Sequence, residues 1–188
     1  MEVADLEQVR DEVISFVNDF IKRADLPFTA SRINDDVYRK INGLRNSEID
    51  WDWAIDFLNS DGHFDLAIGI KLDDDIDGLA IGIYQKEDGV LEIQAIESFV
   101  RFDVEHPLRG RMVELTIIAA TYFVTLVDGT GVHVIDPLDE FLIKYYEMFG
   151  FHLNISFDES CVKRMISDIE ELTATFQRLI HKYEVKDA

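Results

Sequence analysis

The sequence predicts one α/β domain, in which helices flank a mixed and mostly antiparallel sheet. Its 188 residues, 47% of them hydrophobic, are enough to bury one sizeable core. Residues 64–71, 78–85 and 90–99 are apolar stretches separated by short polar turns, a pattern typical of antiparallel hairpins. An apolar helix over 112–127 then leads to a strand at 132–135, and such a helical crossover makes the new strand run parallel to a neighbour. Sheet and helices together indicate an α/β sandwich.

The N-terminal part is expected to be helical. Apolar residues recur at three- and four-residue steps over 4–24, which predicts an amphipathic helix. Pro27 interrupts this pattern, and Thr29 or Ser31 is positioned to cap a second helix that runs to about Leu44.

The remaining elements follow from the same periodicities. A short helix is predicted for 51–59, a second one for 138–149 and a further strand for 152–157. Apolar residues at helical spacing over 162–183 predict a long C-terminal amphipathic helix. The single domain is thus divided into a helical N-terminal addition (1–48), a core (50–157) and a C-terminal helix (158–184). The terminal helices either cover the sheet or build a homodimer.

The composition limits the classes of function. A formal net charge of −20 disfavours direct contact with nucleic-acid phosphates or anionic lipid and favours cationic partners. The longest apolar helix carries Glu114 and is short for a bilayer span, so no membrane association is expected. The one cysteine, Cys161, excludes an intrachain disulfide, which fits a reducing cytoplasm. The histidines show no metal-ligand spacing, so no metal site is expected.

A basic turn precedes the long apolar helix. It reads Pro107-Leu108-Arg109-Gly110-Arg111, and the helix begins at Met112. The free N–H groups and the dipole of a helix both favour an anion at its N-terminus. Two arginines add positive charge, and a glycine lets an anion approach the backbone closely. The turn is therefore a candidate phosphate-binding site.

A second motif, Tyr145-Tyr146-Glu147-Met148-Phe149-Gly150-Phe151, follows the next strand and helix. The order strand, basic turn, helix, strand, helix and Tyr-x-x-x-Gly-Phe resembles the acyl-CoA-binding half of the GNAT superfamily of N-acetyltransferases, over roughly residues 50–157. The resemblance implies that acetyl-CoA donates an acetyl group to an amine by direct attack in a ternary complex. It also implies that the cofactor's pantetheine arm enters a gap between the fourth strand and the crossover strand. The cofactor's pyrophosphate would then be bound by five residues of the turn: Leu108, Arg109, Gly110, Arg111 and Met112.

The turn departs from the family pattern of Arg/Gln-x-x-Gly-x-Gly/Ala. Aligned on Arg109, the chain has Met112 and Glu114 at the positions that are normally small. Glu114 would place a like charge near the pyrophosphate unless Arg109 or Arg111 pairs with it.

Tyr146 matches the family's general acid, which protonates the departing CoA thiolate. A phenol suits that role because it is protonated at neutral pH and can donate to a developing sulfur anion. The competing interpretation is that Tyr145 and Tyr146 are core aromatics of an amphipathic helix. The Gly-Phe spacing favours the acid role for Tyr146 and leaves Tyr145 as a packing residue.

The predicted strand at 90–99 carries a candidate for the general base, Glu97. Strict alternation would place five of its residues on one face: Leu91, Ile93, Ala95, Glu97 and Phe99. Glu97 would then lie on an otherwise apolar face, where burial favours uptake of a proton from an ammonium group. The alternatives are a Glu97 that pairs with Arg101 or reaches solvent, and Glu92 as the base.

Three functions are consistent with these features. The first is an acyl-CoA-dependent N-acetyltransferase that acts on a small-molecule or peptide amine, most simply a cationic one. The second is a non-catalytic protein of the same fold that binds a basic protein partner through its acidic surface. The third is an acidic mimic of nucleic acid that occupies the basic groove of another protein.

Overall fold

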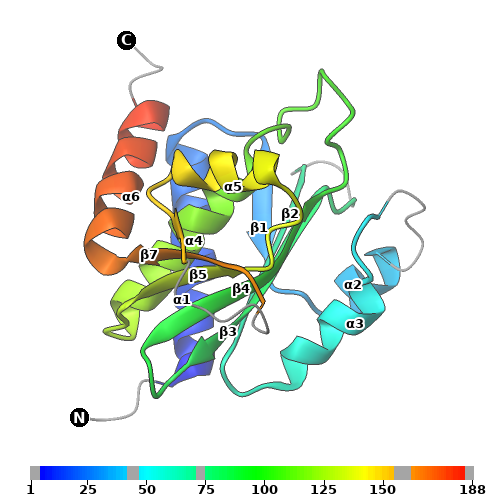
Figure 1. Ribbon diagram of the computed structural model, residues 1–188. Coiled ribbons are helices and arrows are strands. Elements are labelled where there is room, and N and C mark those ends of the chain that lie inside the picture. Colours follow the sequence, from blue (N-terminus) through cyan, green and yellow to red (C-terminus); the bar gives the residue numbers. More distant parts are fainter. Residues whose placement is uncertain (1–4, 42–46, 71–74, 155–161, 185–188) are drawn as a thin grey trace.

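A single sheet runs through the middle of the protein. The computed structural model describes residues 5–41, 47–70, 75–154 and 162–184 (Figure 1). Within these residues, seven strands are ordered β1-β2-β3-β4-β5-β7-β6. All neighbours pair antiparallel except β4 and β5, which are parallel. The predicted mixed, mostly antiparallel sheet flanked by helices is confirmed.

Helices and strands follow one another along the chain in nearly the order that the sequence predicts. In chain order they are α1 (Leu6–Arg23), β1 (Phe28–Ser31), α2 (Asp35–Ile41), α3 (Trp51–Ile55), the 3-10 helix η1 (Asp56–Asn59), β2 (His63–Ile70), β3 (Gly78–Gln85), β4 (Val90–Ser98), α4 (Met112–Leu126), β5 (Gly131–Ile135), α5 (Glu140–Glu147), β6 (His152–Leu153), β7 (Arg164–Asp168) and α6 (Ile169–Glu184).

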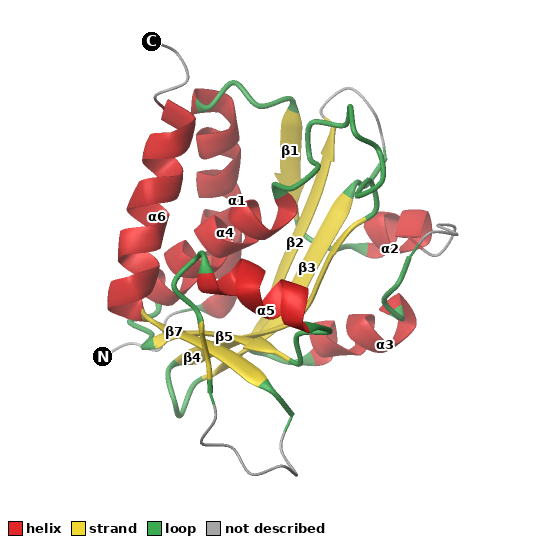
Figure 2. Cartoon of the chain, turned by 45° about the horizontal axis from the view of Figure 1, so that its top comes forward, coloured by secondary structure: helices red, strands yellow, loops and turns green. Residues whose placement is uncertain are grey.

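Helices cover both faces of the sheet (Figures 1 and 2). Residues of α1, α4, α5 and α6 form one core with the face that carries Leu66, which we call the α4 face. Residues of α2 and α3 form a second core with the face that carries Ala67, the α3 face. The two terminal helices α1 and α6 both pack against α4, so they cover the sheet; the homodimer stays a prediction. No helix in the described part of the chain is long and apolar enough to cross a bilayer.

A β-bulge reverses the alternation of β4. Ile81 pairs with Ala95, but the next residue of β3, Gly82, pairs with Ile93, so Gln94 has no partner on β3. Ile93 consequently lies in the α4-face core, whereas Ala95 lies in the α3-face core. Glu97 follows Ala95 onto the α3 face. The predicted shared face of Leu91, Ile93, Ala95, Glu97 and Phe99 is wrong, because the extra residue shifts the period of two.

The segment after Pro27 is a strand and not the start of a helix. Phe28–Ser31 pairs with β2 at the edge of the sheet, so neither Thr29 nor Ser31 caps a helix. The cap of α2 is instead Asn34, whose side chain accepts hydrogen bonds from the N–H groups of Asp36 and Val37. The sheet thus includes part of the predicted helical addition 1–48, and the predicted end of this helix near Leu44 lies outside the described residues.

The C-terminal helix also begins later than expected. Residues 164–168 form β7, which lies between β5 and β6, and α6 begins at Ile169. Asp168 caps α6 by accepting hydrogen bonds from the N–H groups of Glu170 and Glu171. The predicted helix over 158–184 is therefore wrong for this first stretch. Cys161, like the predicted strand residues 155–157, lies outside the described residues.

Candidate active site

The parallel strands β4 and β5 stop pairing about halfway along β4 and near the end of β5. They pair from Val90 to Ile93 on β4 and from Gly131 to Val134 on β5, and not beyond. A cavity of about 440 Å³ opens where the pairing stops. Its walls come from β4, the end of β5 with the turn that follows it, the segment before α3, and α5: Glu48, Ile49, Asp50, Trp53, Ile93, Gln94, Ala95, Ile96, Val134, Ile135, Asp136, Pro137, Leu138, Leu142, Tyr146 and Val162.

Tyr146 lies in the wall of this cavity. It is the one buried residue of α5, and its ring packs against the rings of Tyr145 and Phe151. Burial raises the pKa of the Tyr146 phenol, so the hydroxyl keeps its proton at neutral pH. Among the described residues none forms a hydrogen bond with this hydroxyl. The phenol is therefore free to donate to a group inside the cavity.

The basic turn forms an open hollow at the start of α4. Arg109, Gly110 and Arg111 line it together with His106, and its volume is about 520 Å³. Gly110 has a φ of +72°, a left-handed conformation that glycine adopts without strain, and no atom lies within 4 Å of where a Cβ would stand. No side chain caps the first turn of α4, so its N–H groups stay available to an anion.

The five predicted cofactor residues divide into two groups. Arg109, Gly110 and Arg111 border the hollow, and the Arg111 guanidinium also donates to the Pro107 carbonyl oxygen at 2.7 Å. Leu108 and Met112 are buried in the core, and the Leu108 N–H already donates to His106, so of these two residues only the backbone of Met112 is open to a ligand. These two apolar side chains fix the turn on the sheet.

Met112 and Glu114, which replace the family's small residues, are turned into the protein. A Cβ on Gly78 would lie 2.5 Å from the Met112 sulfur, so the glycine on β3 makes room for this side chain. The buried Glu114 carboxylate accepts hydrogen bonds from the Lys182 ammonium and the Tyr183 hydroxyl of α6, at 2.5 Å each. Its partners are thus on α6 and not Arg109 or Arg111. Neither substitution fills the hollow.

Adjacent tyrosines on α5 connect the hollow with the cavity. The Tyr145 hydroxyl lies 3.4 Å from the Gly110 carbonyl oxygen, to which it donates, while Tyr146 lines the cavity. Tyr145 therefore does more than pack, since it fixes α5 relative to the basic turn.

His106 fixes the turn from its other end. Its Nδ1 accepts a hydrogen bond from the Leu108 N–H at 3.2 Å, and its Nε2 lies 3.6 Å from the buried Asp77 carboxylate. Asp77 in turn accepts from the N–H of Ile70 at the end of β2. Sequence reasoning missed this role of Asp77, because nothing in the local pattern links residue 77 to residue 106.

Glu97 lies behind one wall of the cavity, on the α3 face. Its buried carboxylate accepts hydrogen bonds from the Glu48 N–H, from the Trp51 ring N–H at the start of α3 and from Arg101. The pairing with Arg101 is one of the alternatives that the sequence left open. The role of Glu97 as base stays a prediction. The second choice, Glu92, is bound by Gln85 and by the Arg164 guanidinium on β7 and does not line the cavity.

Three other acids line the cavity and were not singled out from the sequence. They are Glu48, Asp50 and Asp136. Arg101 pairs with Glu48 at 2.9 Å, and Asp50 caps α3 by accepting from the Trp53 N–H. Asp136 directly follows the parallel strand β5, and this position was the available signal, whereas Glu48 and Asp50 precede α3 and carry no such signal. No group of three potential metal ligands occurs in the part of the chain that the structure describes.

The fold matches solved N-acetyltransferases. A spermidine N-acetyltransferase from Vibrio cholerae, solved with CoA and spermine, aligns with a TM-score of 0.58 and 15% identity, over 78% of this chain and 98% of its own. A nourseothricin acetyltransferase aligns with a TM-score of 0.53 and 12% identity, over 77% of this chain and 99% of its own. No protein-family model and no curated protein matches the sequence. The chain has the GNAT fold, with 12–15% sequence identity to these two structures.

Proposed function

We propose that the protein is an N-acetyltransferase that transfers an acetyl group from acetyl-CoA to an amine, and that the amine is cationic. The observation that carries this proposal is the separation of β4 from β5 around a cavity with Tyr146 in its wall. The GNAT fold uses such a gap for the pantetheine arm of its cofactor, as the resemblance implies. Two solved proteins of this fold are named for acetyl transfer to amines, spermidine and nourseothricin.

The basic turn supports the binding of acetyl-CoA as the acyl donor. The open hollow, the two arginines and the uncapped start of α4 suit a pyrophosphate, because each supplies positive charge or N–H donors. The positive φ of Gly110 and the empty space beside it suit an anion that lies against bare backbone. Met112 would contribute through its backbone alone, and Leu108 would contribute only if its N–H left His106.

Tyr146 is proposed as the general acid. When the amine nitrogen attacks the thioester carbonyl, the carbon–sulfur bond breaks and the sulfur leaves with the electron pair. A proton from the Tyr146 hydroxyl would neutralise that thiolate, and the raised pKa of the phenol ensures that the proton is present. The sequence alone predicts Glu97 as the group that removes the acceptor's own proton, but both of its carboxylate oxygens accept hydrogen bonds from the chain itself and it does not line the cavity.

The charge of the cavity wall supports a cationic acceptor. Glu48, Asp50 and Asp136 bring three carboxylates to a cavity that is otherwise largely apolar. The whole protein carries a net charge of −20, which attracts cations toward its clefts.

Release of CoA thiol in the presence of a panel of amines tests this function. We expect turnover with polyamines, aminoglycoside-like amines or Lys-rich peptides, and little with neutral or acidic amines. No thiol release with any amine would favour the non-catalytic alternative, a protein that binds a basic partner.

A further inference from the structure

We propose that Glu97 is a positioning residue, which holds the segment 47–51 in place as one wall of the cavity and does not take the acceptor's proton. The hydrogen-bonding part of this inference is independent of any activity. Its consequence for the acceptor amine rests on the proposed function.

One carboxylate holds the whole segment. Its Oε1 accepts from the Glu48 N–H at 2.6 Å and from the Arg101 guanidinium at 3.3 Å. Its Oε2 accepts from the Trp51 indole N–H at 2.7 Å and from the Ile49 N–H at 3.4 Å. The Ser47 hydroxyl lies 2.8 Å from the same oxygen and 2.7 Å from the Ile49 carbonyl oxygen, and it can donate its one proton to either. Four of these five donors belong to residues of a single short segment.

These contacts leave no room for a base. An ionised carboxylate offers about four lone-pair positions, and the chain's own donors already point at both oxygens. A base must present an open lone pair within hydrogen-bond reach of the proton that it removes. The side chain of Glu97 is also 96% inaccessible, with 4% of its surface exposed, and it does not line the cavity.

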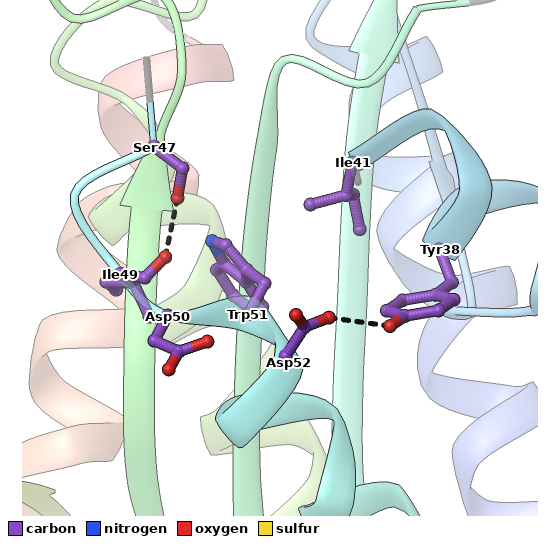
Figure 3. A pocket seen from close by; sticks show the side chains of 7 residues that line it. All are labelled: Tyr38, Ile41, Ser47, Ile49, Asp50, Trp51 and Asp52. Atoms are coloured by element: carbon purple, nitrogen blue, oxygen red, sulfur yellow. Dashed lines mark hydrogen bonds between the residues drawn. The ribbon is translucent and has the colours of Figure 1, made fainter. Parts of the chain in front are cut away.

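The segment that Glu97 holds borders two hollows. Glu48, Ile49 and Asp50 line the 440 Å³ cavity. Ile49, Asp50 and Trp51 line a second hollow of about 150 Å³, which Figure 3 shows together with Ser47 and the Tyr38–Asp52 hydrogen bond. Trp51 is buried in the α3-face core, but Glu48 and Asp50 border a hollow, so the hydrogen bonds from the Glu48 and Ile49 N–H groups to Glu97 help to determine where these acids stand.

The β-bulge explains why this glutamate is available to the segment. Without the extra residue at Gln94, Glu97 would share the α4 face with Ile93. With the bulge it shares the α3 face with Ala95, and it meets the Trp51 ring nitrogen there. Arg101 extends the network, since its second nitrogen pairs with Glu48 at 2.9 Å. Glu48, one of the three acids in the cavity wall, is thereby held through both its backbone and its side chain.

Hydrogen–deuterium exchange of the full chain tests the holding role directly. In Glu97→Gln one of the two accepting oxygens becomes an N–H₂ group, which cannot accept, so the N–H group of Glu48 or of Ile49 should exchange at least about tenfold faster. Exchange in α4 should not change. Trp51→Phe removes one donor to Glu97 and keeps an aromatic ring. If Glu97→Gln fails to fold, Trp51→Phe replaces it as the test, and the Glu48 and Ile49 N–H groups should exchange faster in this variant. Glu92→Gln is the matched control on the same strand and should leave them unchanged. Unchanged exchange in both Glu97→Gln and Trp51→Phe overturns the proposal.

Kinetics then separate a positioning residue from a base. For a positioning residue, Glu97→Gln should raise the KM of the acceptor at least about tenfold, with kcat keeping the wild-type dependence on pH. For a base, the rise of kcat with pH should disappear in Glu97→Gln, and that result overturns the proposal. Failure of the proposed function would be recognised separately, because the wild-type protein would then not bind acetyl-CoA. The exchange measurement would still decide whether Glu97 holds the segment.

Discussion

The Tyr183 hydroxyl donates a hydrogen bond to the Glu114 carboxylate, and this contact joins the end of α6 to the first turn of α4. Lys182 neutralises the same carboxylate. Glu114 occupies a position where the GNAT pattern has a small residue. Its charge is compensated by Lys182 of α6, a helix that was predicted from the sequence only as a C-terminal addition to the core. The candidate cofactor turn therefore depends on α6 for its electrostatic environment.

The first prediction concerns this buried contact. Tyr183→Phe leaves the Glu114 carboxylate without one of its donors, so the free energy of unfolding should fall by about 1–3 kcal/mol. Urea denaturation of the two proteins measures the difference. Tyr122→Phe is the control, since its hydroxyl donates to Glu12 at the surface and its loss should cost less. Equal losses would show that the buried carboxylate does not need Tyr183.

The second prediction concerns the general acid. Tyr146→Phe removes a hydroxyl and keeps the buried ring, so the fold should persist. The turnover number should fall by about 10²- to 10⁴-fold, with little change in the affinity for acetyl-CoA. Steady-state kinetics of Tyr146→Phe and Tyr145→Phe give the comparison. An equal loss in the two variants would indicate packing and contradict the assignment of Tyr146.

The third prediction is a dependence on pH. Burial raises the pKa of Tyr146 above its ordinary value of about 10, so the acid form persists throughout mildly alkaline solution. Because the pKa is raised on folding, the contribution of Tyr146 to the free energy of unfolding is fully present below about pH 10 and is lost only at higher pH. The turnover number should therefore show no decline between about pH 7 and 10 that is due to Tyr146. A decline in that range that is absent from Tyr146→Phe would contradict it.

The fourth prediction concerns the acceptor. Asp136→Asn removes one negative charge from the cavity wall and should raise the KM of a dicationic amine more than that of a monocationic one. Added salt should raise the same constant, because about 0.15 M salt limits the field of a charge to roughly 8 Å. Initial rates with both amines at two salt concentrations provide the measurement. Rates that are indifferent to salt and to Asp136 would mean that the acidity serves solubility or a protein partner.

Long apolar segments allowed most of the sheet to be predicted from the sequence. The strand β3 was predicted at its observed bounds, and β2, β4 and β5 within one residue at each end. Their signal is strong because β2 and β3 are buried over most of their length and all four strands are apolar stretches beside polar turns. The same reasoning failed for β1 and β7. β1 has only four residues, and the apolar residues of β7 continue the helical spacing of α6.

The candidate site was predicted in part. The basic turn and Tyr146 belong to local motifs, and the structure brings them together through Tyr145 and Gly110. The surroundings of Glu97 could not be foreseen, because a bulge adds a residue without altering the apparent alternation of the sequence. Asp77, Asp136 and the pairing of Glu114 with α6 were missed for a related reason. Each depends on a contact between segments far apart in the chain.

Calorimetric titration with acetyl-CoA tests the central claim most directly. The wild-type protein should bind in the micromolar range, and the double variant Arg109→Ala/Arg111→Ala should lose two charge-assisted contacts, each worth about 1.5–3 kcal/mol. Arg39→Ala, an exposed arginine on α2 that pairs only with Asp36 in the described residues, is the control and should bind as the wild type does. No heat of binding for the wild type, or equal affinity for the wild type and the double variant, would contradict a cofactor site at the start of α4.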